Sequence, residues 1–266
     1  MNSNDYEKIA SWFAQYVAPY LEMEQEIRDT VQMKVDHTHR VVAEMNLLIQ
    51  SLELPENDRY TSLSVALLHD VGRFEQFVKY RTLNDRQSES HAQISIDELK
   101  SHRVLDHLTV EEIEIIFKAI DAHSRKTIPE NLDQRSVLFS KLIRDADKLD
   151  IWKVLIEADQ GTTTALNAIV FSDLPDNEEY NPKALKAISS GEMFDLAEIR
   201  SRNDFRLLAM AWVFDLNFSA SFHLVLERGY IDMLAERLPE HENIKKAVLT
   251  VNNYLARHKN RQDLQD

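Results

Sequence analysis

A histidine and an aspartate stand side by side in the stretch VALLHDVGRFEQ, residues 65–76, directly after an apolar run. His69 follows Val65 by four residues, so the two would share one face of a helix. A buried polar group without a partner costs about 1–3 kcal/mol. One metal ion can satisfy several such groups at once, and imidazole nitrogen and carboxylate oxygen are common ligands of first-row metals. The stretch therefore predicts a metal site at the end of a helix.

Three more histidines and a cluster of aspartates fit the same idea. His37 precedes Val41 by four residues, which places both on one face of a helix. His91 and His123 each lie in a helical segment with aliphatic neighbours. An acid inside an apolar helix should face a cation, and the segment KLIRDADKLDIW, residues 141–152, carries several of them. Its aspartates are Asp145, Asp147 and Asp150.

The elements that must position these side chains are expected to be helices. Only four glycines and six prolines occur in 266 residues, so few turns interrupt the chain. Apolar residues recur at three- and four-residue steps, and no long run alternates with the period of two that strands require. The predicted fold class is therefore all-α.

The helix boundaries follow from the same periodicity and from the prolines and glycines. Pro19 is expected to break the first helix, and Gly72 to stop or bend the helix that carries the metal-site motif. Residues 81–88 and 172–182 are expected to be loops. The expected helices span 5–17, 20–54 with an interruption near Lys34, a short segment before Gly72, 89–101, 109–123, 134–158, 183–196 and 201–222, with two more after Gly229.

Composition and charge exclude several classes of function. A net charge of −14 opposes binding to polymeric nucleic acid and to anionic membrane surfaces. The absence of cysteine excludes disulfides and thiolate zinc sites. The N-terminus lacks the basic and apolar regions of a signal peptide, and no run of about 18 apolar residues occurs. We expect a cytoplasmic protein without membrane partners.

The order of the polar motifs resembles that of a known family. His37 in HTHRV, then His69-Asp70 in LLHDVGR, then Asp147 in ADKL resemble the HD-domain superfamily of metal-dependent phosphohydrolases. The resemblance covers about residues 33–155. It implies an HD-domain helical bundle at 33–158, preceded by an N-terminal helical segment, 1–32, and followed by a C-terminal helical extension, 159–266, packed on the core.

The resemblance also implies a set of metal ligands. His37, His69, Asp70 and Asp147 match the residues that hold one ion in the family. His91 and His123 match the two extra histidines of members with a second ion, which Asp70 would bridge. The implied cofactor is one or two divalent ions: Mn, Fe, Co, Ni or Zn, with Mg as an option where carboxylates dominate.

Some of these assignments have alternatives. Helical phase places Asp145 on the apolar stripe of Leu142 and Leu149, whereas the family motif points to Asp147 as the last ligand. His91 and His123 could instead be hydrogen-bonded core histidines or substrate contacts. The aromatic residues between 205 and 222 predict a core cluster, a helix–helix contact or a homodimer contact.

The activity that the resemblance implies is hydrolysis of a small phosphate ester or anhydride, with a nucleotide as the expected substrate and a metal-bound hydroxide as the nucleophile. Asp70, Arg73 and Lys148 are the predicted catalytic residues, and Arg73, Arg86 and Lys148 the predicted substrate contacts. Basic residues near the motifs stand out in an acidic chain: Arg73, Lys79, Arg81, Arg86, Arg125, Lys126 and Lys148.

Two other functions stay open at this point. Some superfamily members with the same six ligands use a mixed-valent di-iron centre to oxidise a small molecule with oxygen. A third alternative is a non-catalytic sensor that binds a nucleotide at a degenerate site.

Overall fold

The computed structural model describes residues 1–161, 171 and 174–260 of the chain. Every regular element among these residues is a helix, which confirms the all-α prediction. The chain divides into two compact units, Met1–Asp147 and Lys148–Asp266. The predicted boundaries at residues 32 and 158, and the packing of the C-terminal extension, stay predictions. None of the described helices is both long and apolar enough to cross a membrane.

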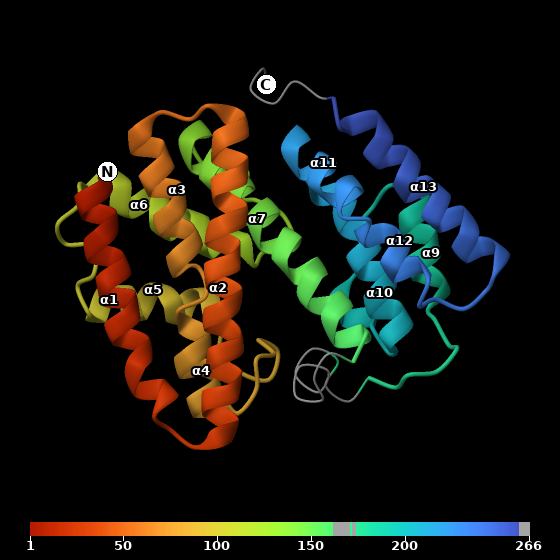
Figure 1. The fold of residues 1–266 in the computed structure, drawn as a ribbon, viewed down its shortest axis with the longest axis horizontal. Helices are drawn as coiled ribbons and strands as arrows, with labels where there is room; N and C mark the ends of the chain where they lie inside the picture. The colour runs from red at the N-terminus through yellow and green to blue at the C-terminus, as the bar shows by residue number, and fades with distance from the viewer. Residues whose placement is uncertain (162–170, 172–173, 261–266) are drawn as a thin grey trace. The chain divides into compact units, whose positions relative to one another are not determined.

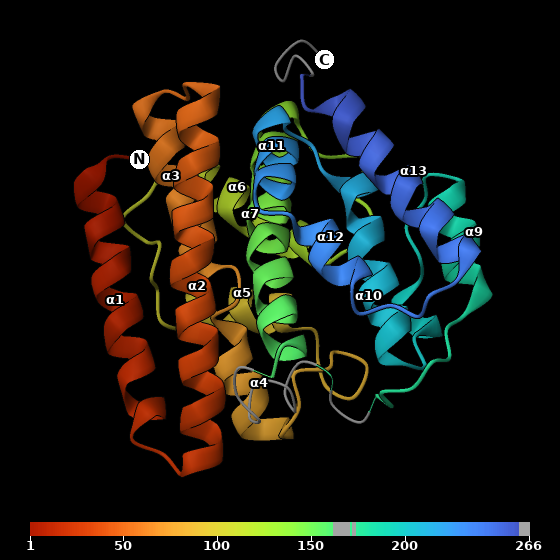
Figure 2. The same ribbon diagram turned by 45° about the vertical axis from the view of Figure 1, so that its right-hand side comes forward.

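Helices α1 to α6 and the first part of α7 form the first unit. Helix α2 packs against α1, α3 and α4, while α5 packs between α4 and α6. Figures 1 and 2 show α1, α2 and α3 side by side. The helices are α1 (Ser3–Leu21), α2 (Gln25–Leu52), α3 (Glu56–Leu68), α4 (Gly72–Tyr80), α5 (His91–Ser101), α6 (Val110–His123) and α7 (Gln134–Asp159).

Two expected interruptions in this unit are wrong. Helix α2 runs through Lys34 without a break, because it contains neither glycine nor proline and its buried side chains continue at helical spacing. Pro19 lies inside α1 and does not break it. Proline has no backbone N–H to donate. In the last turn of a helix it therefore removes only one hydrogen bond, close to the point where the helix ends.

The metal-site motif lies in the turn between α3 and α4. Residues 61–72 are all buried, and the backbone N–H of His69 still donates to Val65 O at 2.9 Å, so helical geometry continues to the histidine. Gly72 begins α4, and its N–H donates to Ser95 Oγ of α5 at 2.8 Å. The predicted bend at Gly72 is therefore a junction between two helices.

Gly72 is also a close-packing contact. A Cβ at this position would collide with the backbone of His91 and Ser95. At an open helical position, exchange of glycine for alanine stabilises by about 0.5–1 kcal/mol. Here we expect Gly72→Ala to lower the free energy of unfolding by about 3 kcal/mol, because α5 must move away. Urea denaturation measures this change, and a variant as stable as wild type or more stable would contradict the contact.

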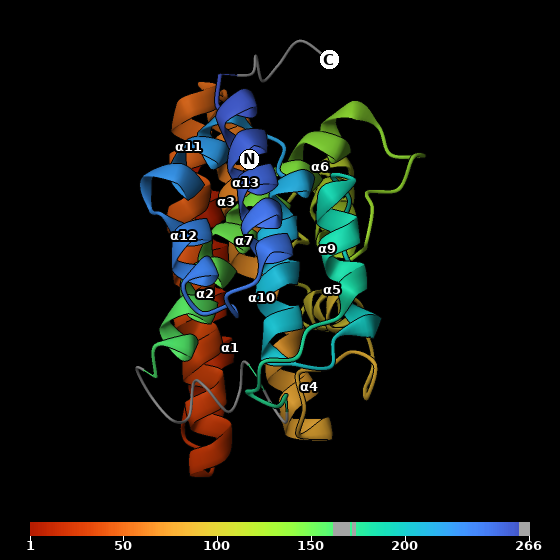
Figure 3. The same cartoon turned by 90° about the vertical axis from the view of Figure 1, so that its right-hand side faces the viewer.

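The second unit contains the remaining described helices and the C-terminal part of α7. Helix α13 packs against α9, α11 and α12, as Figure 3 shows from the side. Trp152 of α7 is fully buried, and its indole N–H donates to Ala209 O at 2.9 Å. The elements are α9 (Pro182–Ser189), η1 (Leu196–Glu198), α10 (Arg202–Ala211), η2 (Trp212–Asp215), α11 (Ser219–Glu227), α12 (Tyr230–Ala235) and α13 (Glu242–His258).

Two predicted helices of this unit are too long. The helix expected over 183–196 ends at Ser189, because Gly191 takes a left-handed conformation (φ 71°) that terminates it. The helix expected over 201–222 is divided into α10, η2 and α11. Between the last two, Asn217 Nδ2 donates to Asp215 O at 3.1 Å, a local bond that competes with helix continuation. The loop expected at 172–182 contains residues 172 and 173, which lie outside the described part of the chain.

Candidate metal centre

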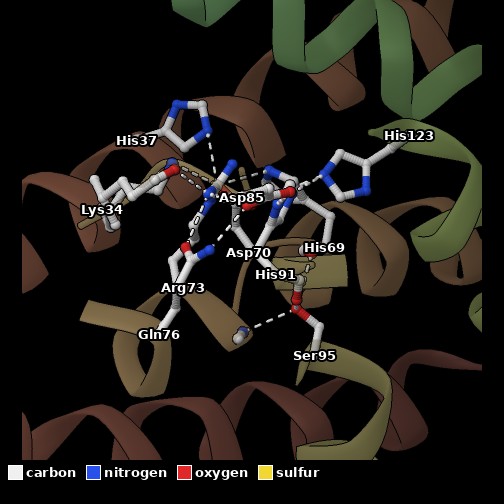
Figure 4. A network of polar contacts seen from close by, with 12 residues as sticks. Lys34, His37, His69, Asp70, Arg73, Gln76, Asp85, His91, Ser95 and His123 are labelled. Atoms are coloured by element: carbon white, nitrogen blue, oxygen red, sulfur yellow. Dashed lines mark hydrogen bonds and ion pairs between the residues drawn. The ribbon is translucent and has the colours of Figure 1, made fainter. Parts of the chain in front are cut away.

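Asp70 lies at the centre of a cluster of imidazole and carboxylate groups (Figure 4). Helix α2 contributes one histidine, the α3–α4 turn contributes the His-Asp pair, and α5, α6 and α7 contribute one group each. His37 and His123 lie on opposite sides of Asp70 in this view. The six side chains are those that the sequence pattern predicted: His37, His69, Asp70, His91, His123 and Asp147.

The two oxygens of Asp70 face different partners. Oδ2 lies 3.6 Å from His37 Nε2 and 3.6 Å from His69 Nε2. Asp147 closes this side, with its Oδ1 at 3.2 Å from His37 Nε2 and 3.7 Å from His69 Nε2. We name this group of four residues subsite 1.

The other oxygen of Asp70 faces a second pair of histidines. Oδ1 lies 3.4 Å from His91 Nε2 and 3.8 Å from His123 Nε2. The two Nε2 atoms are 3.0 Å apart. We name Asp70, His91 and His123 subsite 2. Asp70 belongs to both subsites, one oxygen in each.

Hydrogen bonds at Nδ1 determine which nitrogen of each ring is available to a ligand. His69 Nδ1 lies 2.8 Å from Ala66 O, and His123 Nδ1 lies 2.5 Å from Ile120 O. A backbone carbonyl only accepts, so both Nδ1 atoms carry the proton and both Nε2 atoms present a lone pair. His91 Nδ1 faces a carboxylate oxygen of Asp85 at 2.6 Å, with the same consequence.

This geometry fits metal ions. Nitrogen and oxygen ligands at about 2.0–2.2 Å from one ion, with about 90–120° between bonds, lie roughly 2.8–3.8 Å apart. The seven atom pairs given above span 3.0–3.8 Å. In addition, His69 Nε2 and Asp70 Oδ1 are buried and make no hydrogen bond to the described residues. Two lone pairs that face each other at 3.0 Å, as in subsite 2, need a cation between them.

Charge around the cluster keeps its acids ionised. Burial alone would raise the pKa of Asp70, but the charge of Lys34, the neighbouring imidazole of His69 and the charge of Arg73 hold that pKa well below its usual value. Lys34 Nζ is in ion-pair contact with Oδ2, and Arg73 Nε lies 3.5 Å from Oδ1. Burial likewise opposes ionisation of Asp147, and the neighbouring imidazoles of His37 and His69 outweigh it, so the pKa of Asp147 is also lowered.

Burial has the opposite effect on the histidine of α5. Burial, reinforced by the charge of Arg73, lowers the pKa of His91 to about 3. His91 is therefore neutral at pH 7, and the neutral imidazole is the form that binds a metal.

The structure separates the two candidate aspartates of α7. Asp147 lies in the cluster, and 17% of its side chain is exposed. Asp145 is fully buried and belongs to none of the metal-capable groups found among the described residues. Helical phase correctly indicated burial for Asp145, while the metal centre lies on a neighbouring face of the helix.

The predicted cationic contacts lie in different surroundings. Arg73 Nη1 donates to three acceptors of the protein: Gln76 Oε1, Leu83 O and Asp85 Oδ1. Lys148 forms an ion pair with Asp215 at 2.7 Å, and Arg86 is exposed in the segment before α5. Lys79, Arg81 and Arg125 pair with surface acids, namely Glu89, Glu24 with Glu26, and Asp121.

Sequence reasoning missed three residues at this centre. Lys34 precedes His37 by three residues, and this helical spacing was a usable signal. Gln76 lies on α4 but acts through Asp85, and Asp85 lies in a segment without regular structure, so no periodicity marked this contact. Only the short separation of Asp85 from His91 in the chain hinted at their contact.

One of the comparisons with known proteins gave a match. No curated protein and no solved structure matched the chain. The family model of the HD domain matches residues 35–152, a range that begins just before His37 and ends after Asp147. All six side chains of the cluster fall inside that match. Residues 35–152 are therefore similar to the HD domain, a helical domain of the metal-dependent hydrolase type.

Proposed function

We propose that the protein is a metal-dependent phosphohydrolase that acts on a small phosphate ester or anhydride, with nucleotides as the expected class. The observation that supports this most is the position of Asp70, which has one carboxylate oxygen in each subsite. Subsite 1 would hold one ion and subsite 2 a second. When bound, a pair of ions lowers the pKa of water and balances the charge of a phosphoryl group.

The residues of the chain itself prepare the centre for an anionic substrate. Asp70 stays ionised and provides one carboxylate oxygen to each subsite. Lys34 lies beside Asp70 with 13% of its side chain exposed, so its ammonium group can add positive charge where a phosphoryl oxygen would lie. Arg73 Nη1 donates hydrogen bonds to Leu83 O and Asp85 Oδ1, so the main role of Arg73 is to hold the segment around Asp85. Lys148 stays a proposed substrate contact, next in the chain to Asp147.

A substrate screen tests this proposal. The full chain, stripped of metal and reloaded with Mn, Mg, Co, Ni, Zn or Fe, would be incubated without oxygen with nucleotides and sugar phosphates. We expect metal-dependent release of phosphate or pyrophosphate from at least one nucleotide. Metal analysis of the same samples gives the number of ions per chain.

Two results of this screen would overturn the proposal. Turnover that requires oxygen and two irons per chain would assign the centre to oxidation of a small molecule. Nucleotide binding without turnover under every metal would assign it to a sensor.

A further inference from the structure

One acidic side chain outside the six candidate ligands contacts the centre directly. Asp85 lies in segment 81–90, the irregular connection between α4 and α5. Its Oδ2 accepts from His91 Nδ1 at 2.6 Å. Its Oδ1 accepts from Arg73 Nη1 at 2.9 Å and from Gln76 Nε2 at 2.8 Å. Asp85 therefore links two side chains of α4 to a ligand on α5.

The same two α4 residues hold the rest of the segment. Gln76 is fully buried, and its Nε2 also donates to Ser88 Oγ at 2.7 Å and to Glu89 O at 3.0 Å. Arg73 Nη1 donates to Leu83 O at 2.6 Å. Arg73 and Gln76 are three residues apart, so they project from one face of the helix. The position of Asp85 is thus determined by hydrogen bonds that two side chains of α4 donate to it and to its neighbours in the segment.

The Asp85 contact has a specific effect on His91. An ionised carboxylate only accepts hydrogen bonds, so the proton of a neutral His91 lies on Nδ1 and the lone pair lies on Nε2. Nε2 is the atom that faces Asp70 Oδ1 and His123 Nε2 in subsite 2. The ligands of subsite 1 come from α2, the α3–α4 turn and α7, all outside segment 81–90.

We propose that Asp85 is a positioning residue that holds His91 as an Nε2 ligand, and that segment 81–90 thereby sets the affinity of subsite 2 for its ion. The proposal rests on the two-ion centre of the proposed function. Carboxylate partners of metal-binding histidines fix the ring and its tautomer, and their loss costs about 10–100-fold in metal affinity. Subsite 1 would then load first and independently of this segment.

The substitution Asp85→Asn tests the tautomer with almost no change of volume. Two donors, Arg73 Nη1 and Gln76 Nε2, face Oδ1, so the amide oxygen of asparagine takes this position. The amide NH₂ must then face His91 Nδ1 and donate to it. This moves the ring proton to Nε2, where it blocks coordination, in the way that an asparagine imposes the wrong tautomer on a catalytic histidine.

The experiment uses the full chain and two readouts. Titration of the metal-free chain with Mn²⁺, followed by calorimetry and metal analysis, gives an affinity for each subsite. Long-range ¹H–¹⁵N NMR of the metal-free chain reports the His91 tautomer. The matched control is Asp97→Asn, which removes one negative charge from an exposed position on α5.

We expect wild type and Asp97→Asn to bind two ions and to show the Nδ1–H tautomer of His91. In Asp85→Asn the second ion should bind about 10–100-fold more weakly, the first within twofold of wild type, and His91 should carry its proton on Nε2. If Asp85→Asn binds both ions as wild type does, or keeps the Nδ1–H tautomer, the role of Asp85 is wrong. Equal weakening of both ions would also overturn it. If wild type itself binds fewer than two ions, the two-ion centre fails as well.

Discussion

Asp70→Ala abolishes turnover and removes both ions from the chain: this is the largest effect that we expect. Each subsite takes one oxygen of this carboxylate, so its loss leaves two histidines and Asp147 in subsite 1 and two histidines in subsite 2. Without the ions that activate water and balance phosphoryl charge, the rate should fall by more than about 1,000-fold. Phosphate release and metal content per chain measure the two effects.

Two further variants make this result interpretable. Asp70→Asn keeps the volume of the side chain and should also lose the ions, which separates metal loss from unfolding. Asp36→Ala removes an exposed acid next to His37 in α2 and should keep full activity. Circular dichroism should show the same helix content in all three proteins. A fully active Asp70→Ala protein would contradict the metal centre and the proposed hydrolysis together.

Removal of metal should lower stability as well as activity. The buried His69 Nε2 and Asp70 Oδ1 have no hydrogen-bond partner among the described residues, so ion binding satisfies atoms that folding has already desolvated. An ion present at about 100 times its dissociation constant stabilises the folded state by roughly 2.7 kcal/mol. For a unit of this size, this corresponds to a rise of roughly 5–10 °C in the midpoint of thermal unfolding.

Scanning calorimetry of chelator-treated and Mn²⁺-reloaded protein measures this shift. His69→Ala is the matched variant, because it removes a ligand of subsite 1 and should show a much smaller dependence on the ion. An equal shift in His69→Ala would indicate that the ions bind elsewhere on this acidic chain. No shift in wild type would contradict the centre itself.

The candidate ligands could be predicted from the sequence because each lies on a helix or at its end. Apolar spacing around His37 and His69 indicated which face of the helix would be buried, and the structure brings these faces together. Spacing alone was insufficient for α7. The apolar stripe identified Asp145 as the buried acid, and only the family motif pointed to Asp147. Burial and participation in a site are different properties, and periodicity reports only the first.

The residues that support the ligands were beyond sequence reasoning for a physical reason. Asp85 reaches His91 through a segment whose conformation depends on hydrogen bonds from Arg73 and Gln76. No local propensity encodes such long-range bonds. The missed helix ends of the second unit have another cause: the Asn217–Asp215 bond and the left-handed Gly191 act locally, and apolar periodicity does not include such local effects.

Helix α7 crosses the border between the two compact units, with Asp147 as the last residue of the first and Lys148 as the first of the second. The part of the chain that matches the HD-domain model, residues 35–152, therefore ends inside α7 and not at the border between the units. A gene fusion or domain transplant that cuts at the border would expose the broken end of a helix directly after Asp147, a candidate metal ligand. A cut after Asp159 would instead separate Lys148 from Asp215. Any exchange of the C-terminal unit must therefore keep α7 to its end at Asp159 and supply an acid to replace the one that Lys148 loses.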